Sequence, residues 1–258
     1  MALKGFRTYD LVIDAVGVFQ VSAMARPSID KFEDTLSDMQ CIFSSKAEGC
    51  QGLISLIDVA EGELDRVVPY LSKAIVQTKL NHLYMTHDFA DFGSPSIESL
   101  VQFRQKVLYM VQQAGPKLGV HCRAGHGRSG TMVASLYIYQ CIQKTLIEDL
   151  SELLEPVSYP HKLSDYDHRS PEDMINTQYY RICVLALDFV KKQGSKPSPS
   201  SIEVDNQVRA LERYTDYLCA EKREHGELKD CIYPKEHHRT YCLVTNQDYP
   251  ACVSERQE

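Results

Sequence analysis

Residues 119–131 read Gly119-Val-His-Cys-Arg-Ala-Gly-His-Gly-Arg-Ser-Gly-Thr131, and this stretch guides the interpretation of the whole chain. A brief strand is predicted before it, at residues 117–121, and a very apolar helix follows at residues 131–143. Gly125 and Gly127 allow the backbone to turn tightly with its N–H groups pointing inward. The N–H groups and the dipole at the start of the helix add to them, so the sequence predicts a cradle for a phosphate dianion.

Two side chains give this cradle a chemical function. Cys122 lies at its edge, where the positive field favours the thiolate over the thiol. Arg128 follows six residues later and can bind two phosphoryl oxygens at once. A thiolate nucleophile beside an oxyanion cradle predicts phosphoryl transfer.

Residues 121–130 resemble the signature of the cysteine-based protein tyrosine phosphatase superfamily, which is His-Cys, five residues, and Arg followed by Ser or Thr. The commoner form of that signature is matched as well, by Ala124, Gly125, Gly127, Ser129 and Gly130. The chain is most similar to the dual-specificity type, whose core can be laid along residues 8–193.

The resemblance implies a role for each residue of the motif. Cys122 would attack phosphorus and form a cysteinyl-phosphate, His121 would orient the loop and tune the thiolate, and Ser129 would stabilise the thiolate as it leaves. The residues expected to surround the phosphate are Arg123, Ala124, Gly125, His126, Gly127 and Arg128. This chemistry needs no metal ion and no organic cofactor.

A carboxylic acid is expected before the helix predicted at residues 97–113, because the leaving oxygen needs a proton. In compact dual-specificity members the acid lies four residues before a proline and twelve before an aromatic residue. Asp91 meets both conditions with Pro95 and Phe103, and Asp88 is the alternative.

The remaining pattern alternates between strands and helices. Strands are expected at residues 11–19, 53–57, 83–84 and 117–121. Helices are expected at residues 27–39, 64–77, 97–113, 131–143 and 172–192, and the last of these includes Gln178. Ser28 is the expected N-cap of the first helix, Ser94-Pro95-Ser96 precedes the third, and the capping box Thr145–Glu148 predicts the start of one more. Residues 155–167 are expected to form an exposed loop. This alternation predicts an α/β fold, and the resemblance implies a central, mainly parallel twisted sheet flanked by helices, as in protein tyrosine phosphatases.

A Pro/Ser/Gly-rich stretch at residues 194–201 reads as a linker between a catalytic domain, 1–193, and a tail, 202–258. The tail opens with an amphipathic helix that either docks on the catalytic core or binds a partner; its apolar residues are Ile202, Val204, Val208, Leu211, Tyr214 and Leu218. Further on lies a loose group of possible ligands, Cys231, His237, His238, Cys242 and Cys252. These lack paired Cys-x2-Cys spacing, so no metal site is predicted.

The composition indicates which partners and which cellular compartment to expect. The net charge of −7 argues against general binding to nucleic acid or anionic membranes. The longest apolar run, residues 132–142, is too short to cross a bilayer, and we expect no membrane anchor. Nine irregularly spaced cysteines indicate a reducing compartment, the cytoplasm or the nucleus. The oligomeric state is not predicted.

Two substrate classes stay open. A phosphorylated protein, bearing phosphotyrosine or phosphoserine/threonine, is the main expectation. Arg123 and His126 favour a phosphoinositide as the alternative, because lipid-directed members often carry lysines at these positions. RNA 5′-triphosphatases tend to lack the acid that Asp91 supplies. A non-catalytic phosphate-binding module is disfavoured, because the cysteine, the arginine and an acid are all present.

Overall fold

The computed structural model describes residues 7–28, 32–43, 49–57, 83–87, 89, 93–161, 175–193, 202, 204–228, 240–242 and 247–248. The predicted helix at 64–77 and the linker at 194–201 lie outside these residues, as do all members of the tail Cys/His group except Cys242.

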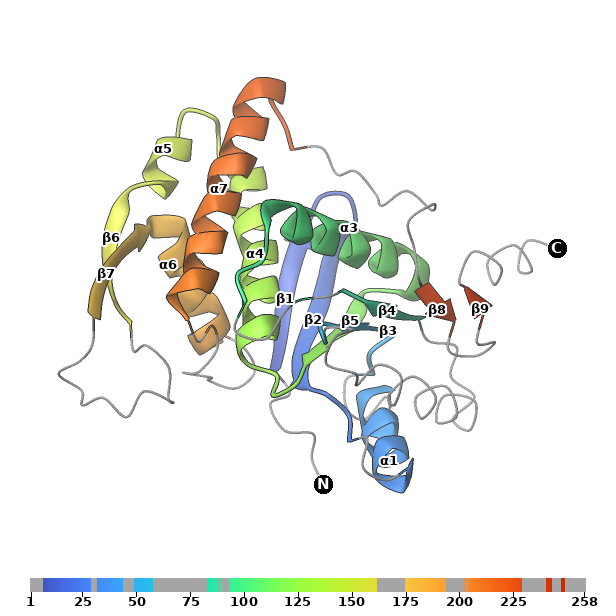
Figure 1. The fold of residues 1–258 in the computed structure, drawn as a ribbon. Coiled ribbons are helices and arrows are strands. Elements are labelled where there is room, and N and C mark those ends of the chain that lie inside the picture. Colours follow the sequence, from blue (N-terminus) through green and yellow to red (C-terminus); the bar gives the residue numbers. More distant parts are fainter. Residues whose placement is uncertain are drawn as a thin grey trace.

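A seven-stranded sheet forms the centre of the molecule (Figure 1). Its strands are β1 (Arg7–Ile13), β2 (Gly17–Ala25), β3 (Gly52–Ser55), β4 (Leu83–Thr86), β5 (Lys117–Cys122), β8 (Thr240–Cys242) and β9 (Gln247–Asp248). They lie in the order β1-β2-β5-β3-β4-β8-β9. The four central strands β2, β5, β3 and β4 run parallel, and β1 and β8 pair with them in the antiparallel sense. The predicted α/β class with a mainly parallel centre is confirmed.

Helices flank this sheet. They are α1 (Phe32–Phe43), α3 (Ile97–Ala114), α4 (Gly127–Lys144), α5 (Leu150–Leu153), α6 (Arg181–Asp188), a π-helical turn (Phe189–Gln193) and α7 (Asp205–His225). In Figure 1, α4 lies between the sheet and α7, and contacts join it to both. None of the described helices is long and apolar enough to cross a membrane.

The predictions closest to the signature are confirmed. The strands expected at 53–57, 83–84 and 117–121 correspond to β3, β4 and β5, and the long helix expected at 97–113 is α3. Ser96 caps α3 as predicted, because its hydroxyl oxygen accepts a hydrogen bond from the Ser99 N–H at 3.0 Å.

Two predictions near the N-terminus are wrong. Residues 11–19 are not one strand but the centre of a hairpin, in which Ile13 pairs with Gly17 across a turn. Gly17 has a positive φ of 74°, a conformation that glycine adopts readily. The first helix begins at Phe32 rather than at residue 27, and Ser28 is not its N-cap; the Ser28 N–H instead donates to the Asp38 carboxylate at 2.8 Å.

Part of the expected loop at 155–167 and part of the expected helix at 172–192 are strands instead, while residues 162–174 lie outside the described residues. β6 (Pro156–His161) pairs antiparallel with β7 (Ile175–Tyr180), and α6 begins at Arg181. Tyr and Thr fit a strand better than a helix, and β6 provides a partner strand. Gln178 therefore lies on a strand and not on the final helix.

The capping box at Thr145–Glu148 is also wrong. Thr145 instead ends α4, and its hydroxyl donates to the Cys141 carbonyl oxygen at 2.9 Å. The helix that follows, α5, has only four residues and begins at Leu150.

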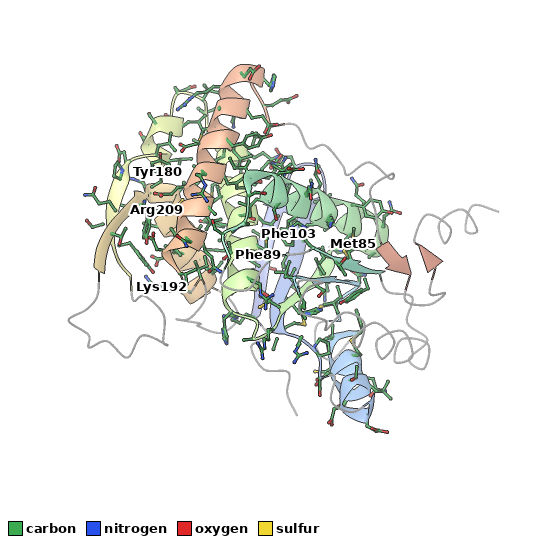
Figure 2. All side chains as sticks on the ribbon, in the orientation of Figure 1. Met85, Phe89, Phe103, Tyr180, Lys192 and Arg209 are labelled. Carbon is green, nitrogen blue, oxygen red and sulfur yellow. The ribbon has the colours of Figure 1, made fainter. Side chains whose placement is uncertain are left out.

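Helix α7 packs on the core of its own chain. Its apolar face joins the same buried cluster as the sheet through Val208, Leu211, Tyr214, Leu218 and Cys219. Figure 2 labels Arg209 and Tyr180 where α7 meets β7. There the Arg209 Nη1 donates to the Gln178 carbonyl oxygen at 3.2 Å, and the Tyr180 N–H donates to Glu212 at 3.0 Å.

Candidate active site

The signature residues form the turn between the central strand β5 and the helix α4. β5 ends at Cys122 and α4 begins at Gly127. Gly125 has a positive φ of 81°, and a Cβ atom there would collide with the Ala25 nitrogen and the Met24 carbonyl carbon at the end of β2. Only glycine therefore lets the turn lie this close to the neighbouring strand.

The turn folds back onto the sulfur of Cys122. The Gly125 N–H donates to the Cys122 Sγ at 3.1 Å, and Cys122 is buried. The side chain of His126, the N-cap residue of α4, makes no capping hydrogen bond, and the first turn of the helix carries no acidic residue. The positive end of the helix dipole therefore meets no carboxylate of its own helix.

Arg128 lies in the first turn of α4 and is 1% exposed. Its Nη1 donates to the carbonyl oxygens of Leu56 and Phe89, both at 3.2 Å. Leu56 follows β3 and Phe89 follows β4, so the guanidinium joins two loops to the signature turn.

Two further signature residues are fully buried. Burial lowers the pKa of His121 to about 3, and the charges of Arg26 and Arg128 act in the same direction, so this imidazole is neutral near neutral pH. The Ser129 hydroxyl has no hydrogen-bond partner among the residues that the structure describes. A buried hydroxyl in that condition is ready to bond to a group that enters or forms beside it.

The other signature residues differ in exposure. Arg123 and Ala124 are exposed, and His126 is half-buried. The carbonyl oxygen of Arg123 accepts from the Arg26 N–H at 3.4 Å, which brings the segment after β2 beside the turn. The turn therefore presents an arginine to solvent.

Arg7 is a residue of this site that sequence reasoning missed. It begins β1, is buried, and its Nη2 donates to the Gly125 carbonyl oxygen. It shares the inward face of β1 with Tyr9, Leu11 and Ile13. A signal was present in the sequence, because an arginine in phase with the buried positions of a strand must find a partner.

The candidate acids Asp91 and Asp88 lie outside the described residues, but the structure fixes their flanks. The His87 N–H donates to the Ser55 carbonyl oxygen at 2.8 Å, and its Nε2 is 3.0 Å from the Ser99 hydroxyl. The His87 ring packs on Phe103, with the ring centroids 5.4 Å apart. Phe89, which stands between the two candidates in the sequence, lies beside the signature turn, because its carbonyl oxygen accepts from Arg128.

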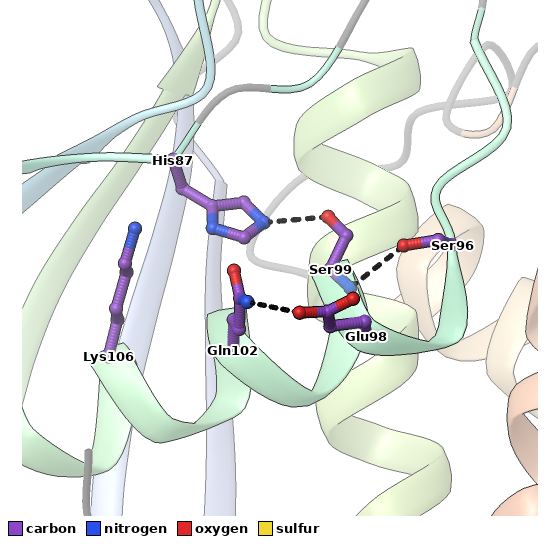
Figure 3. Close-up of a pocket in the computed structure, with 6 residues that line it drawn as sticks. All are labelled: His87, Ser96, Glu98, Ser99, Gln102 and Lys106. Carbon is purple, nitrogen blue, oxygen red and sulfur yellow. Dashed lines mark hydrogen bonds between the residues drawn. The ribbon is translucent and has the colours of Figure 1, made fainter. Parts of the chain in front are cut away.

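A pocket lies next to this segment, between the end of β4 and the first turns of α3 (Figure 3). Its lining is polar and consists of His87, Ser96, Glu98, Ser99, Gln102 and Lys106. These groups bond to one another or to the backbone, as in Gln102 to Glu98 at 3.0 Å and Lys106 to the Thr86 carbonyl oxygen at 2.8 Å. No signature residue lines it, so the signature turn and this pocket are separate.

Comparison with known proteins is in line with this geometry. The family model PTP-SAK, described as a Swiss Army Knife protein, DSP-PTPase phosphatase domain, matches residues 67–179. No curated protein matches the chain in sequence.

Solved structures resemble the chain over most of its length. A kinase-associated phosphatase (KAP) is 18% identical, covers 84% of this chain and 98% of its own, and gives a TM-score of 0.47. PTPMT1 is 18% identical, with coverage of 84% and 100% and a TM-score of 0.42. Tk-PTP in its active form is 17% identical, with coverage of 76% and 91% and a TM-score of 0.42.

The segment matched by the family model, residues 67–179, includes the motif at residues 121–130, which joins the central strand to α4. Through this segment, the chain is similar to the cysteine-based phosphatases of the dual-specificity type.

Proposed function

We propose that this protein hydrolyses phosphomonoesters through a cysteinyl-phosphate, acting on phosphotyrosine and phosphoserine/threonine of protein substrates. The observation that carries the proposal is the turn from Cys122 to Arg128. Its Gly125 amide points at the sulfur, and Arg128 is held beside it by two carbonyl oxygens.

In the proposed reaction the Cys122 thiolate attacks phosphorus, so that an S–P bond forms as the bond to the leaving oxygen breaks. The loop amides and Arg128 hold the three equatorial oxygens, where charge accumulates. Asp91 gives its proton to the leaving oxygen, and the alcohol or phenol departs. Water, deprotonated by Asp91, then attacks phosphorus and releases inorganic phosphate and the Cys122 thiolate.

Ser129 and His121 support the second step in this scheme. The buried Ser129 hydroxyl would donate a hydrogen bond to the sulfur as negative charge returns to it. His121 is neutral and buried, so we assign it a positioning role beneath the loop rather than proton transfer.

A phosphoinositide is the second candidate substrate, and the exposure of Arg123 favours it. This arginine lies in the turn and faces solvent, with His126 half-buried next to the helix. A ligand with several phosphates would gain charge-assisted hydrogen bonds there. In either case the proposal includes neither a nucleic-acid partner nor a membrane anchor, and it places the protein in the cytoplasm or the nucleus.

The test is phosphate release by the full chain, without added metal, from substrates run in parallel. Phosphotyrosine and phosphothreonine peptides, phosphoinositides and triphosphate-ended RNA are compared, with Cys122→Ser as the blank. We expect peptide turnover to exceed lipid turnover. Lipid preference that disappears in Arg123→Ala would instead establish the second candidate. Absence of Cys122-dependent release from every substrate would exclude the proposed activity.

The acid is identified by a second comparison. Asp91→Asn should lower kcat on phosphopeptides about a hundredfold and remove the basic limb of its pH profile. Asp88→Asn is the matched control and should change kcat less than about threefold. The reverse pattern would assign the acid to Asp88.

A further inference from the structure

Arg7 stands apart from the other buried arginines that the structure describes because it reaches the signature turn from the edge strand β1. The Arg7 Nη2 donates to the Gly125 carbonyl oxygen, although 118 positions separate the two residues. Arg7 is 2% exposed, so this charge has been taken almost completely out of water. Burying an arginine is costly unless the charge has partners, which raises the question of what Arg7 does here.

Gly125 is fixed on both sides of its α-carbon. Its N–H points to the Cys122 sulfur, and its carbonyl oxygen points to Arg7. In a planar trans peptide the C=O and the following N–H point in opposite directions. The N–H of His126, which shares a peptide unit with the Gly125 carbonyl, therefore points away from Arg7.

Charge links Arg7 to the same sulfur. Burial lowers the pKa of the Arg7 guanidinium, while its electrostatic interactions with Tyr9 and Cys122 act in the opposite direction. The charged and titratable groups on the elements around Cys122 are Arg7 and Tyr9 on β1, Arg26 after β2, His121 on β5, Arg123 and His126 in the turn, and Arg128 on α4.

We propose that Arg7 is a positioning residue of the phosphate loop: it holds the Gly125 carbonyl through a charge-assisted hydrogen bond, so that the loop amides face the phosphate. This role rests on the proposed function, since it assumes that the loop receives a phosphate which Cys122 attacks. It assigns part of the site to β1, which lies outside the segment matched by the family model.

Three substitutions separate the charge of Arg7 from its shape. Arg7→Lys keeps the positive charge, Arg7→Gln keeps hydrogen-bond donors without the charge, and Arg7→Met keeps neither. Arg104→Met is the matched control, because Arg104 is also 2% exposed but lies over the Tyr139 ring at 4.0 Å and donates to the Tyr214 hydroxyl at 3.4 Å.

The measurement is the rate at which iodoacetamide alkylates Cys122 as a function of phosphate concentration, quantified on the peptide that contains Cys122. Inorganic phosphate should protect Cys122 of wild type from alkylation, because it occupies the loop. About tenfold more phosphate should be needed to protect Arg7→Met and Arg7→Gln, whereas Arg7→Lys and Arg104→Met should stay within about twofold of wild type.

Thermal unfolding shows which variants are folded at the assay temperature, and if Arg7→Met is not, the comparison of Arg7→Gln with Arg7→Lys decides. The proposal is overturned if the neutral variants are protected at the same phosphate concentration as Arg104→Met, or if Arg7→Lys needs as much phosphate as Arg7→Gln. Alkylation needs no turnover. A wild type that releases no phosphate from any substrate, yet shows this dependence on Arg7, would therefore refute the proposed function alone.

Discussion

The two ends of helix α4 differ in the contacts that the rest of the protein makes with them. At the C-terminal end, the Nζ of Lys222 on α7 donates to the carbonyl oxygens of Ile142, Gln143 and Thr145, at 2.7, 2.8 and 2.6 Å. At the N-terminal end, the His126 side chain does not cap the helix, and the buried Arg7 and Arg128 lie at the turn. The protein satisfies one end with its own cation, while the other end keeps the positive character that favours an anion.

The difference shows how stability and chemistry are distributed along one helix. Lys222 is buried and serves as a fixed C-terminal cap supplied from a distant part of the chain. At the opposite end the cations have no fixed anion on the helix itself. Substitutions at the C-terminal end of α4 should therefore lower stability, and substitutions at the N-terminal end should lower activity.

The largest effect is expected at Arg128. Arg128→Lys keeps a charge but loses the planar fork that binds two oxygens, so kcat/KM should fall about a thousandfold. The measurement is steady-state turnover of a phosphopeptide. Arg104→Lys, a buried arginine away from the turn, is the control and should retain activity; a loss of equal size there would mean that burial rather than phosphate binding explains the result.

Gly125→Ala should have the second largest effect on activity. The added methyl group meets the backbone at the end of β2, and the positive φ disfavours alanine, so the turn must shift and kcat/KM should fall roughly thirtyfold. Gly226→Ala is a closely matched control: its φ of 78° is nearly that of Gly125, but no atom lies within 4 Å of its Cβ position. It should cost about 1 kcal/mol of unfolding free energy and leave turnover unchanged. Equal loss of turnover in both variants would show that backbone strain alone is responsible.

Lys222→Met tests the other end of α4. Three carbonyl oxygens lose a charged donor, so the free energy of unfolding, measured in urea, should fall by about 2 kcal/mol. Turnover well below the melting temperature should be unchanged. Lys144→Met, which removes an exposed lysine from the last turn of the same helix, should have almost no effect on stability. Lost turnover in folded Lys222→Met would show that the two ends are coupled.

The smallest effect concerns acid pH. Burial lowers the pKa of both His87 and His121 to about 3, below the ordinary value of 6.5, so below about pH 6.5 the unfolded chain binds protons that the folded chain does not. Stability should therefore fall as pH drops from 6.5 toward 3, and His87 alone should account for a loss of about 1 kcal/mol over the first unit, from pH 6.5 to 5.5. Urea unfolding of His87→Gln should show a shallower slope, while the exposed His225→Gln should match wild type. An unchanged slope in His87→Gln would contradict the expectation.

The signature turn could be predicted from sequence because its determinants are local. Gly125, Gly127 and the strand and helix on either side lie within a few residues of Cys122, and the structure forms the turn that they predict. Three of the four central strands, β3, β4 and β5, and the helix α3 were predicted for the same reason, whereas β2 was not.

The failures concern partners that are distant in sequence. The segment at 175–180 became a strand because β6 pairs with it, which its own pattern does not reveal. Arg7 reaches Gly125 across 118 positions and Lys222 reaches α4 across about 80, so neither contact leaves a local pattern. Gly17 gave a usable turn signal, and the error at residues 11–19 came from giving more weight to the β-branched residues around it.

The buried face of α7 shows that the packed core extends further along the chain than the match to the family model. That match ends at residue 179, yet residues 205–225 shield the apolar surface of α4 and α3 from water. A protein truncated within residues 194–201 would keep every signature residue, but it would expose this apolar surface and tend to aggregate. The shortest piece that carries the chemistry is therefore smaller than the shortest piece that remains monodisperse, and expression trials should extend through Leu228, which is buried in the same core.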